Sequence, residues 1–163
     1  MMLISLHHVW RRWIIIAPMN QGGEPIMKTV IESKTAPIPI SPYSQAVANG
    51  NLLFVSGFIG QDPSTGKLVN HSIEAEIRQV FANIQAVVKE AGFEMSDIHK
   101  TTVFVTDFSF YGLFNSIYNE YFPESHPARS TVQVADLLLD ARIEIEAIAV
   151  KNETWKGGIP RDW

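Results

Sequence analysis

Apolar residues recur along the chain at the spacings of two helices. A first series begins after Ser72 and repeats every three or four positions, which predicts one buried face of a helix that ends before Gly92. The series consists of Ile73, Ile77, Val80, Phe81, Ile84, Val87 and Val88. A second helix is predicted over residues 109–122, because Pro123 ends the pattern. Its predicted inward positions are Leu113, Ile117, Tyr118 and Tyr121.

Strands are predicted on both sides of these helices. Residues 30–33 predict a short first strand, and two apolar runs within residues 46–57 predict a hairpin. Further strands are expected over residues 96–105, 129–135 and 142–150, with a short helical turn between the last two. This order predicts an α+β domain in which two helices pack on one face of a mixed sheet.

The sheet has a second face that the two helices leave uncovered. In the last strand, alternation directs Ile143, Ile145 and Ala147 to one side and Glu144 and Glu146 to the other. A face that mixes polar and apolar side chains either contacts water or packs on another subunit. We favour packing on other subunits in a closed oligomeric barrel.

The two ends of the chain differ from its middle. Residues 1–26 contain an apolar run shorter than the roughly 7 to 15 residues of a signal-peptide core and the about 20 residues that span a membrane. We interpret this segment as a disordered or non-native leader, with a short targeting segment or an interfacial anchor as the alternatives. Residues 27–150 form the predicted domain, and residues 151–163 are expected to be an extended tail.

The composition indicates a single domain without nucleic-acid or membrane partners. With 163 residues, 46% of them hydrophobic, the chain has the size of one domain around one core. A formal charge of -4 provides no broad basic surface for phosphates. The segment "MKTVIESKTAP" from Met27 is typical of a cytosolic start, so we expect a cytoplasmic protein. The chain has no cysteine, which excludes disulfides and thiolate chemistry.

The polar residues carry no signature of a metal or cofactor. The domain's histidines, His71, His99 and His126, lack the spacing of zinc ligands. Glycine-rich phosphate loops, GxGxxG motifs and GxSxG nucleophile elbows are also missing from the sequence. We therefore expect neither a metal nor a cofactor, and chemistry based on arginine and carboxylate groups.

Two of the three arginines between residues 27 and 150 are expected to be ordinary surface groups. Arg78 follows Glu74 by four positions on the first helix, which predicts a solvent-exposed ion pair. Arg142 stands at the start of the last strand and is also expected to be exposed.

The third arginine, Arg129, has a more restricted backbone. Pro127 limits the chain before it and a predicted strand follows it. A guanidinium on such a fixed stem can bind the carboxylate of a ligand through two parallel hydrogen bonds. It can equally form a structural ion pair with Glu144 or Glu146 across the sheet, and the residues alone leave both interpretations open.

Six segments occur over roughly residues 27–150 in an order and at separations that characterise one family. They are "SPYSQAV", "NGNLLFVSGFIGQDPSTG", "DIHKTTVFVTD", "FNSIYNEYF", "PARSTVQVA" and "IEIEAIAV". Together they resemble the RidA/YjgF family of reactive-intermediate deaminases. The resemblance implies a chorismate-mutase-like α+β fold, assembled as a homotrimer whose sheets form a central barrel with a ligand cleft at each subunit interface.

The same resemblance implies an activity in metabolite damage control. It is the cofactor-free hydrolysis of 2-imino acids, or of enamine tautomers such as 2-aminoacrylate, to 2-oxo acids and ammonia. An enzyme of this type is a 2-iminobutanoate/2-iminopropanoate deaminase. Its substrates leak from pyridoxal-phosphate-dependent dehydratases that act on serine or threonine.

The resemblance also assigns roles to particular residues. Arg129 of "PARS" matches the arginine that grips the substrate carboxylate, and Glu144, the first glutamate of "IEIE", matches the residue that positions or activates water. Tyr43 is expected to reach the cleft from across the interface. The residues expected to bind substrate are Tyr43, Ser56, Gly57, Phe58, Asn115 and Thr131.

Four positions leave alternatives open. Many relatives have a cysteine where this chain has Thr131, which excludes thiol chemistry but keeps one hydrogen-bond donor. Many have a glutamine where this chain has Phe58, which is expected to make the cleft more apolar. Glu146 is the alternative catalytic carboxylate because it shares a face with Glu144. His126 is either an acid/base group or an ordinary turn residue.

Two other functions remain candidates. A trimer that binds small carboxylates without turnover, as a sensor or regulatory module, would use the same arginine cleft. An RNA-acting translation inhibitor, a role attributed to some relatives, is disfavoured by the acidic charge and by the lack of a cluster of basic and stacking aromatic residues.

Overall fold

A computed structural model describes residues 28–151, so the predicted leader and residues 152–163 of the tail lie outside the described part. Six strands form one sheet in the order β1-β2-β3-β6-β4-β5. Only β4 and β5 run parallel, which confirms the mixed sheet. The strands are β1 (Thr29–Ile31), β2 (Ala46–Asn49), β3 (Leu52–Ile59), β4 (Ile98–Val105), β5 (Ala128–Gln133) and β6 (Ile143–Val150).

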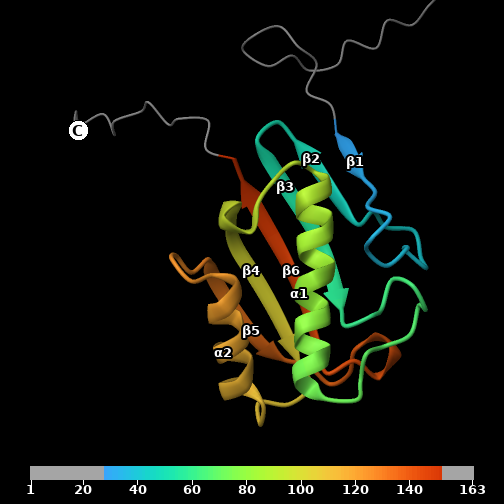
Figure 1. Ribbon diagram of the computed structural model, residues 1–163, viewed down its shortest axis with the longest axis vertical. Helices are drawn as coiled ribbons and strands as arrows, with labels where there is room; N and C mark the ends of the chain where they lie inside the picture. Colours follow the sequence, from blue (N-terminus) through green and yellow to red (C-terminus); the bar gives the residue numbers. More distant parts are fainter. Residues whose placement is uncertain (1–27, 152–163) are drawn as a thin grey trace, which may run out of the picture.

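Two helices, α1 (Ile73–Glu90) and α2 (Tyr111–Tyr121), cover the same face of the sheet (Figure 1). The first begins where its sequence predicts, because the hydroxyl of Ser72 accepts a hydrogen bond of 3.0 Å from the backbone N–H of Ala75. It ends before Gly92, whose φ of 75° suits a residue without a Cβ. The predicted first helix is therefore confirmed.

The second helix starts two residues later than predicted, and one of its four predicted inward positions is wrong. The carboxylate of Asp107 accepts hydrogen bonds from the N–H and hydroxyl of Ser109, both at 2.7 Å, and this local turn delays the helix. Leu113, predicted to face inward, is 38% exposed. Phe114 takes its place in the core, because Phe114, Ile117 and Tyr118 recur at the spacing of one helix face.

Four predicted strands are slightly shorter than expected, with β5 covering residues 128–133 rather than 129–135 and β6 beginning at residue 143 rather than 142. β4 begins at Ile98 because Met95–Asp97 form a 3-10 turn, closed by a capping box between Glu94 and Asp97. β1 covers residues 29–31 rather than 30–33. The alternation predicted for the last strand is confirmed, since Ile143, Ile145 and Ala147 are buried on the helix side.

The face opposite the helices carries a row of apolar side chains in register across four strands. Val30 pairs with Val47, Val47 with Phe54 and Phe54 with Ile148. Val30, Phe54 and Ile148 remain 47%, 45% and 38% exposed. Such a row is suited to burial against another subunit, and the predicted trimeric barrel stays a prediction.

The segment between β5 and β6 contains the predicted helical turn, Leu138–Asp140. Leu139 and Asp140 have φ values of 59° and 58°, which non-glycine residues seldom adopt. In Figure 1 this orange segment lies beside the green loop that precedes α1. Arg142 at its end was expected to be exposed. Its side chain is 37% exposed, yet its Nε contacts the fully buried carboxylate of Glu76 at 2.6 Å.

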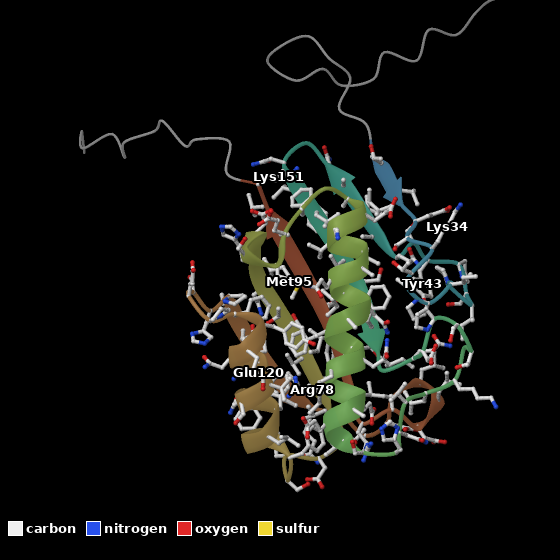
Figure 2. All side chains as sticks on the ribbon, viewed as in Figure 1. Lys34, Tyr43, Arg78, Met95, Glu120 and Lys151 are labelled. Carbon is white, nitrogen blue, oxygen red and sulfur yellow. The ribbon has the colours of Figure 1, made fainter. Side chains whose placement is uncertain are left out.

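The predicted ion pair of Arg78 is confirmed and extends further. Its Nε contacts Glu74 at 2.9 Å, and its Nη1 contacts Glu120 of α2 at 2.8 Å. Figure 2 shows Arg78 and Glu120 facing each other between the two helices. The pair therefore links α1 to the helix that covers β5.

Candidate functional site

Arg129 lies under α2 with its guanidinium held in one orientation. Its Nη2 donates to the hydroxyl of Tyr111 at 3.0 Å and to Oδ1 of Asn115 at 2.9 Å. Three aromatic rings surround its Cζ, with centroids 5.6, 5.2 and 4.6 Å away for Tyr111, Phe114 and Tyr118. Contacts of this kind favour a cation and reduce the ordering needed when an anion binds.

Tyr118 is the nearest of these rings and is itself fixed from below. Its hydroxyl shares a buried hydrogen bond of 2.9 Å with the hydroxyl of Thr101 on β4. Burial raises the pKa of Tyr118, so its ring remains a neutral platform beside Arg129. Nothing in the sequence indicated that Tyr118 supports Arg129, although the spacing of Tyr111, Asn115 and Tyr118 places all three on one side of α2.

A cavity of about 600 Å³ opens beside the guanidinium. We call it the arginine pocket, and it is lined by Asn115, Ser116, Tyr118, Asn119, His126, Pro127 and Arg129. The ring Nε2 of His126 lies 2.8 Å from Oδ1 of Asn119, so this histidine borders the pocket while bonded to α2. No carboxylate from the described part of the chain lines the pocket, which makes it suited to an anion.

The alternative ion pair of Arg129 with Glu144 or Glu146 does not form within residues 28–151. β4 lies between β5 and β6 in the sheet. Arg129 also faces the helices, whereas both glutamates alternate with buried residues and face the open side. The guanidinium thus keeps its charge without a carboxylate partner from this part of the chain.

Glu144 lies on the open side, with its carboxylate packed directly against Gly57. A Cβ on Gly57 would overlap Oε1 of Glu144 and lie 2.8 Å from its Cδ. The register of β3 and β6 shifts between Val55 and Phe58, and this irregularity brings Gly57 beneath the carboxylate. Glycine is required here because the two groups approach closely.

The environment of Glu144 favours its protonated form. Burial, and secondarily the charge of Glu146, raise the pKa of Glu144 above its ordinary value. Burial and the nearby Glu144 likewise raise the pKa of the Tyr43 phenol. A carboxyl group with a raised pKa is better matched to accepting and returning a proton near neutral pH.

A second cavity, of about 370 Å³, surrounds this carboxylate. We call it the glutamate pocket, and its lining includes Tyr43, Ser56, Gly57, Phe58, Glu144 and Glu146. The hydroxyl of Ser56 donates to the carbonyl of Ser44 at 2.7 Å, which ties β3 to the segment that carries Tyr43. Figure 2 shows Tyr43 on that segment, away from α2.

Phe58, which was expected to make the cleft more apolar, lines the glutamate pocket, and two further apolar residues line it with greater exposure. The side chain of Phe58 is only 4% exposed and belongs to the core. Ile40 and Leu138 also line the pocket and are 63% and 59% exposed. Neither was singled out in the sequence, because each stands in a loop whose position only the fold determines.

The predicted site residues therefore gather in two places. Arg129 and Asn115 lie together in the arginine pocket, whereas Glu144 lies in the other pocket with four of the predicted residues. Thr131 is half-buried on β5 and lines neither cavity. One subunit does not bring Arg129 and Glu144 to the same ligand.

Within residues 28–151, no three histidine, aspartate or glutamate side chains come together in a way that could hold a metal ion. No helix in this part of the chain has the length and apolar character needed to cross a membrane.

Comparison with known proteins identifies the family. Residues 33–151 match the family model described as Endoribonuclease L-PSP. The chain is also 40% identical to Reactive Intermediate Deaminase A of Arabidopsis thaliana over 146 residues, which cover 90% of this chain and 78% of that protein. This chain is a member of the RidA/YjgF family.

Other RidA/YjgF relatives are similar over nearly their whole length. The mouse 2-iminobutanoate/2-iminopropanoate deaminase is 43% identical over 127 residues, which cover 78% of this chain and 94% of that protein. The crystal structure of E. coli TdcF with bound serine matches with a TM-score of 0.73 and 41% identity, over 76% of this chain and 99% of that chain. The fold predicted from the RidA/YjgF resemblance is thereby confirmed for the single subunit.

Proposed function

We propose that this protein hydrolyses 2-imino acids, or their enamine tautomers, to 2-oxo acids and ammonia. The observation that carries the proposal is a preorganised guanidinium without a carboxylate partner among residues 28–151, in a chain whose relatives include named imine deaminases. A 2-imino acid presents one carboxylate beside an electrophilic carbon. Arg129 supplies the group that binds such a carboxylate through charge-assisted hydrogen bonds.

The active unit in this proposal is a homotrimer in which Arg129 of one subunit meets Glu144 of a neighbour. Within one subunit the two residues lie on strands separated by β4, about 10 Å apart in the sheet, and point to opposite faces. Joining the sheets would also bury the apolar row of Val30, Val47, Phe54 and Ile148. Both arguments favour a site shared between subunits.

The proposed reaction consumes water and needs no cofactor. Arg129 holds the substrate carboxylate, and Glu144 orients a water molecule about 3 Å from C2 and accepts one of its protons. The water oxygen forms a bond to C2 while the imine nitrogen gains a proton, giving a carbinolamine. The hydroxyl of the carbinolamine then gives up its proton, which is returned to nitrogen through Glu144, so that the C–N bond breaks, ammonia leaves and the C2 oxygen becomes the carbonyl of the 2-oxo acid. An enamine substrate is first protonated at C3 to give the imine.

The experiment is a coupled assay in which an amino-acid oxidase or a threonine dehydratase generates the imine and the released ammonia is followed. One charge-assisted hydrogen bond contributes roughly 1.5 to 3 kcal/mol. Arg129→Ala is therefore expected to lower kcat/KM for 2-iminopropanoate by at least about tenfold. Arg129→Lys is expected to restore little, because lysine lacks the planar fork.

The same assay separates the proposal from its rivals. A carboxylate-binding module would bind 2-oxobutanoate through Arg129 without accelerating ammonia release, and that result would refute the enzymatic proposal. A protein that acts on RNA would retain labelled RNA on a filter at physiological salt, which the formal charge of -4 disfavours. Wild-type activity in Arg129→Ala, still in its native oligomer, would show that the carboxylate binds elsewhere.

A further inference from the structure

Residues 28–151 contain five buried polar side chains, three of which form hydrogen bonds to residues that line the two pockets. The five are Ser33, Gln45, Glu76, Asn83 and Thr101. Thr101 supports the ring beneath Arg129. Gln45 donates to the carbonyl of Pro37 at 2.8 Å, and Pro37 lines the glutamate pocket. Polar groups are costly to bury, so their placement marks backbone that the fold holds in one geometry.

Two of these residues, Glu76 and Asn83, lie two turns apart on the buried face of α1. Asn83 donates to the carbonyls of Ile59 and Gln61 at 3.1 and 2.9 Å, which fixes the end of β3. Glu76 fixes the start of β6, the strand that pairs with β3 at this point through Ile59 and Glu144. α1 thus holds both strands that meet at the candidate catalytic carboxylate.

The contact of Glu76 is a two-point clamp on Arg142. One carboxylate oxygen accepts from the backbone N–H of Arg142 and the other from its Nε, both at 2.6 Å. Arg142 also donates from Nη2 to the carbonyl of Asn70 at 3.3 Å, and its own carbonyl accepts from the N–H of Thr106 at 3.0 Å. Glu76 is fully buried, and a Cβ on Gly60 would lie 2.7 Å from its Cγ.

Arg142 connects the two walls of the glutamate pocket. Glu144 follows it by two residues, and Leu138, whose loop contains two residues with positive φ, precedes it by four. Backbone in such a conformation persists only where its surroundings hold it. A buried ion pair contributes little stability compared with apolar packing, so the retention of this one agrees with a role in geometry.

We propose that Glu76 is a positioning residue: through Arg142 it fixes the start of β6 and the adjoining loop so that Glu144 is held in the glutamate pocket against Gly57. This inference rests on the proposed function for its effect on turnover. The effect of Glu76 on the position and pKa of Glu144 can be measured whether or not the protein turns over an imine. Loss of the clamp opens the pocket, hydrates Glu144 and returns its pKa towards the ordinary value, while Glu146 and Tyr43 remain the titratable groups that face it.

Glu76→Gln tests the clamp, because glutamine has nearly the same shape but can accept only one of the two hydrogen bonds. The expected result is a fall of at least tenfold in kcat/KM for 2-iminopropanoate, with the acidic limb of the pH profile displaced to lower pH. Arg142→Lys breaks the same Nε contact from the other side and is expected to give the same displacement. The double variant is expected to add little, since both changes remove one interaction.

Glu74→Gln is the matched control, because Glu74 lies on the same helix with its side chain 52% exposed and contacts Arg78 only. It is expected to leave kcat/KM and the pH profile unchanged. A second readout is the pKa of Glu144 followed by NMR of its ¹³C-labelled side-chain carboxyl in wild type and Glu76→Gln. Partial unfolding of a variant lowers activity at every pH but moves neither the limb nor this pKa.

The outcomes separate the two proposals. A wild type without imine hydrolysis would refute the proposed function, and the NMR titration would still decide the role of Glu76. A folded Glu76→Gln protein whose Glu144 titrates as in wild type would overturn the inference. A lower Glu144 pKa in both Glu76→Gln and Arg142→Lys, but not in Glu74→Gln, would support it.

Discussion

Gly57→Ala is expected to displace the carboxylate of Glu144 without removing it. The variant therefore tests whether catalysis depends on where this carboxylate lies, and not only on its presence. The added Cβ would overlap Oε1 of Glu144 and lie 2.8 and 3.1 Å from its Cδ and Cγ. Carbon atoms in contact are normally about 3.5 to 4.0 Å apart, so the carboxyl group must retreat by about 1 Å. A misplacement of that size costs on the order of a hundredfold in rate, or about 2.7 kcal/mol of transition-state stabilisation.

The assay is ammonia release from 2-iminopropanoate at saturating and limiting substrate. Most of the loss is expected in kcat, because Arg129 and its pocket are not changed by the substitution. Gly112→Ala on α2 is the matched control, since a Cβ there meets nothing within 4 Å. Alanine in the helix is expected to stabilise the fold slightly and to leave kcat/KM unchanged.

A background without the carboxylate sharpens this test. In Glu144→Gln, activity is already low, and Gly57→Ala is expected to lower it by much less than a hundredfold because both changes disturb one group. If Gly57→Ala is folded and keeps kcat/KM within threefold of wild type, the close approach of Gly57 and Glu144 does not matter for catalysis. The reasoning that assigns water activation to Glu144 would then fail.

Three further outcomes are expected. Burial raises the pKa of Glu144, so its ionisation lowers the stability of the folded state as pH rises through that pKa. Glu144→Gln is therefore expected to raise Tm above neutral pH but not below the ordinary glutamate pKa. Equal Tm differences between the variant and wild type at all pH values would contradict this. Phe54→Asp places a charge in the apolar row and is expected to lower the oligomeric mass in sedimentation. The control Glu90→Lys reverses a charge outside the row and is expected to leave the oligomeric mass unchanged. Thr101→Val leaves the buried hydroxyl of Tyr118 unpaired and is expected to cost about 1 to 3 kcal/mol in urea unfolding; adding Tyr118→Phe is expected to recover much of this, and no recovery would refute the hydrogen bond's role.

The spacing of apolar residues predicted most of the secondary structure. The apolar part of the inward face of α1 is the series predicted from Ile73 to Val88, because a helix with one apolar stripe has few other ways to bury it; the structure adds the buried polar residues Glu76 and Asn83. The second helix was less certain, since Leu113 and Phe114 are both apolar and only the sheet beneath selects the one that points inward. A local hydrogen bond from Ser109 to Asp107 then moved its start, which periodicity does not register.

The candidate residues were identifiable from the sequence, but their arrangement was not. The motifs around Arg129 and Glu144 predicted which residues carry the chemistry, because those residue types at those positions resemble a family. Sequence did not reveal that the guanidinium rests among three rings, or that the two residues occupy separate pockets on opposite faces.

The clearest divergence concerns Glu76 and Arg142, which stand 66 residues apart. Glu76 was not singled out in the sequence, and Arg142 was expected only to be exposed. Only the packing of α1 on the ends of β3 and β6 brings them together and removes Glu76 from water. Local patterns along this chain determined the elements and the chemical groups, because both depend on neighbouring residues. The tertiary structure decided which groups meet, because contacts between distant segments depend on how the whole sheet and its helices pack.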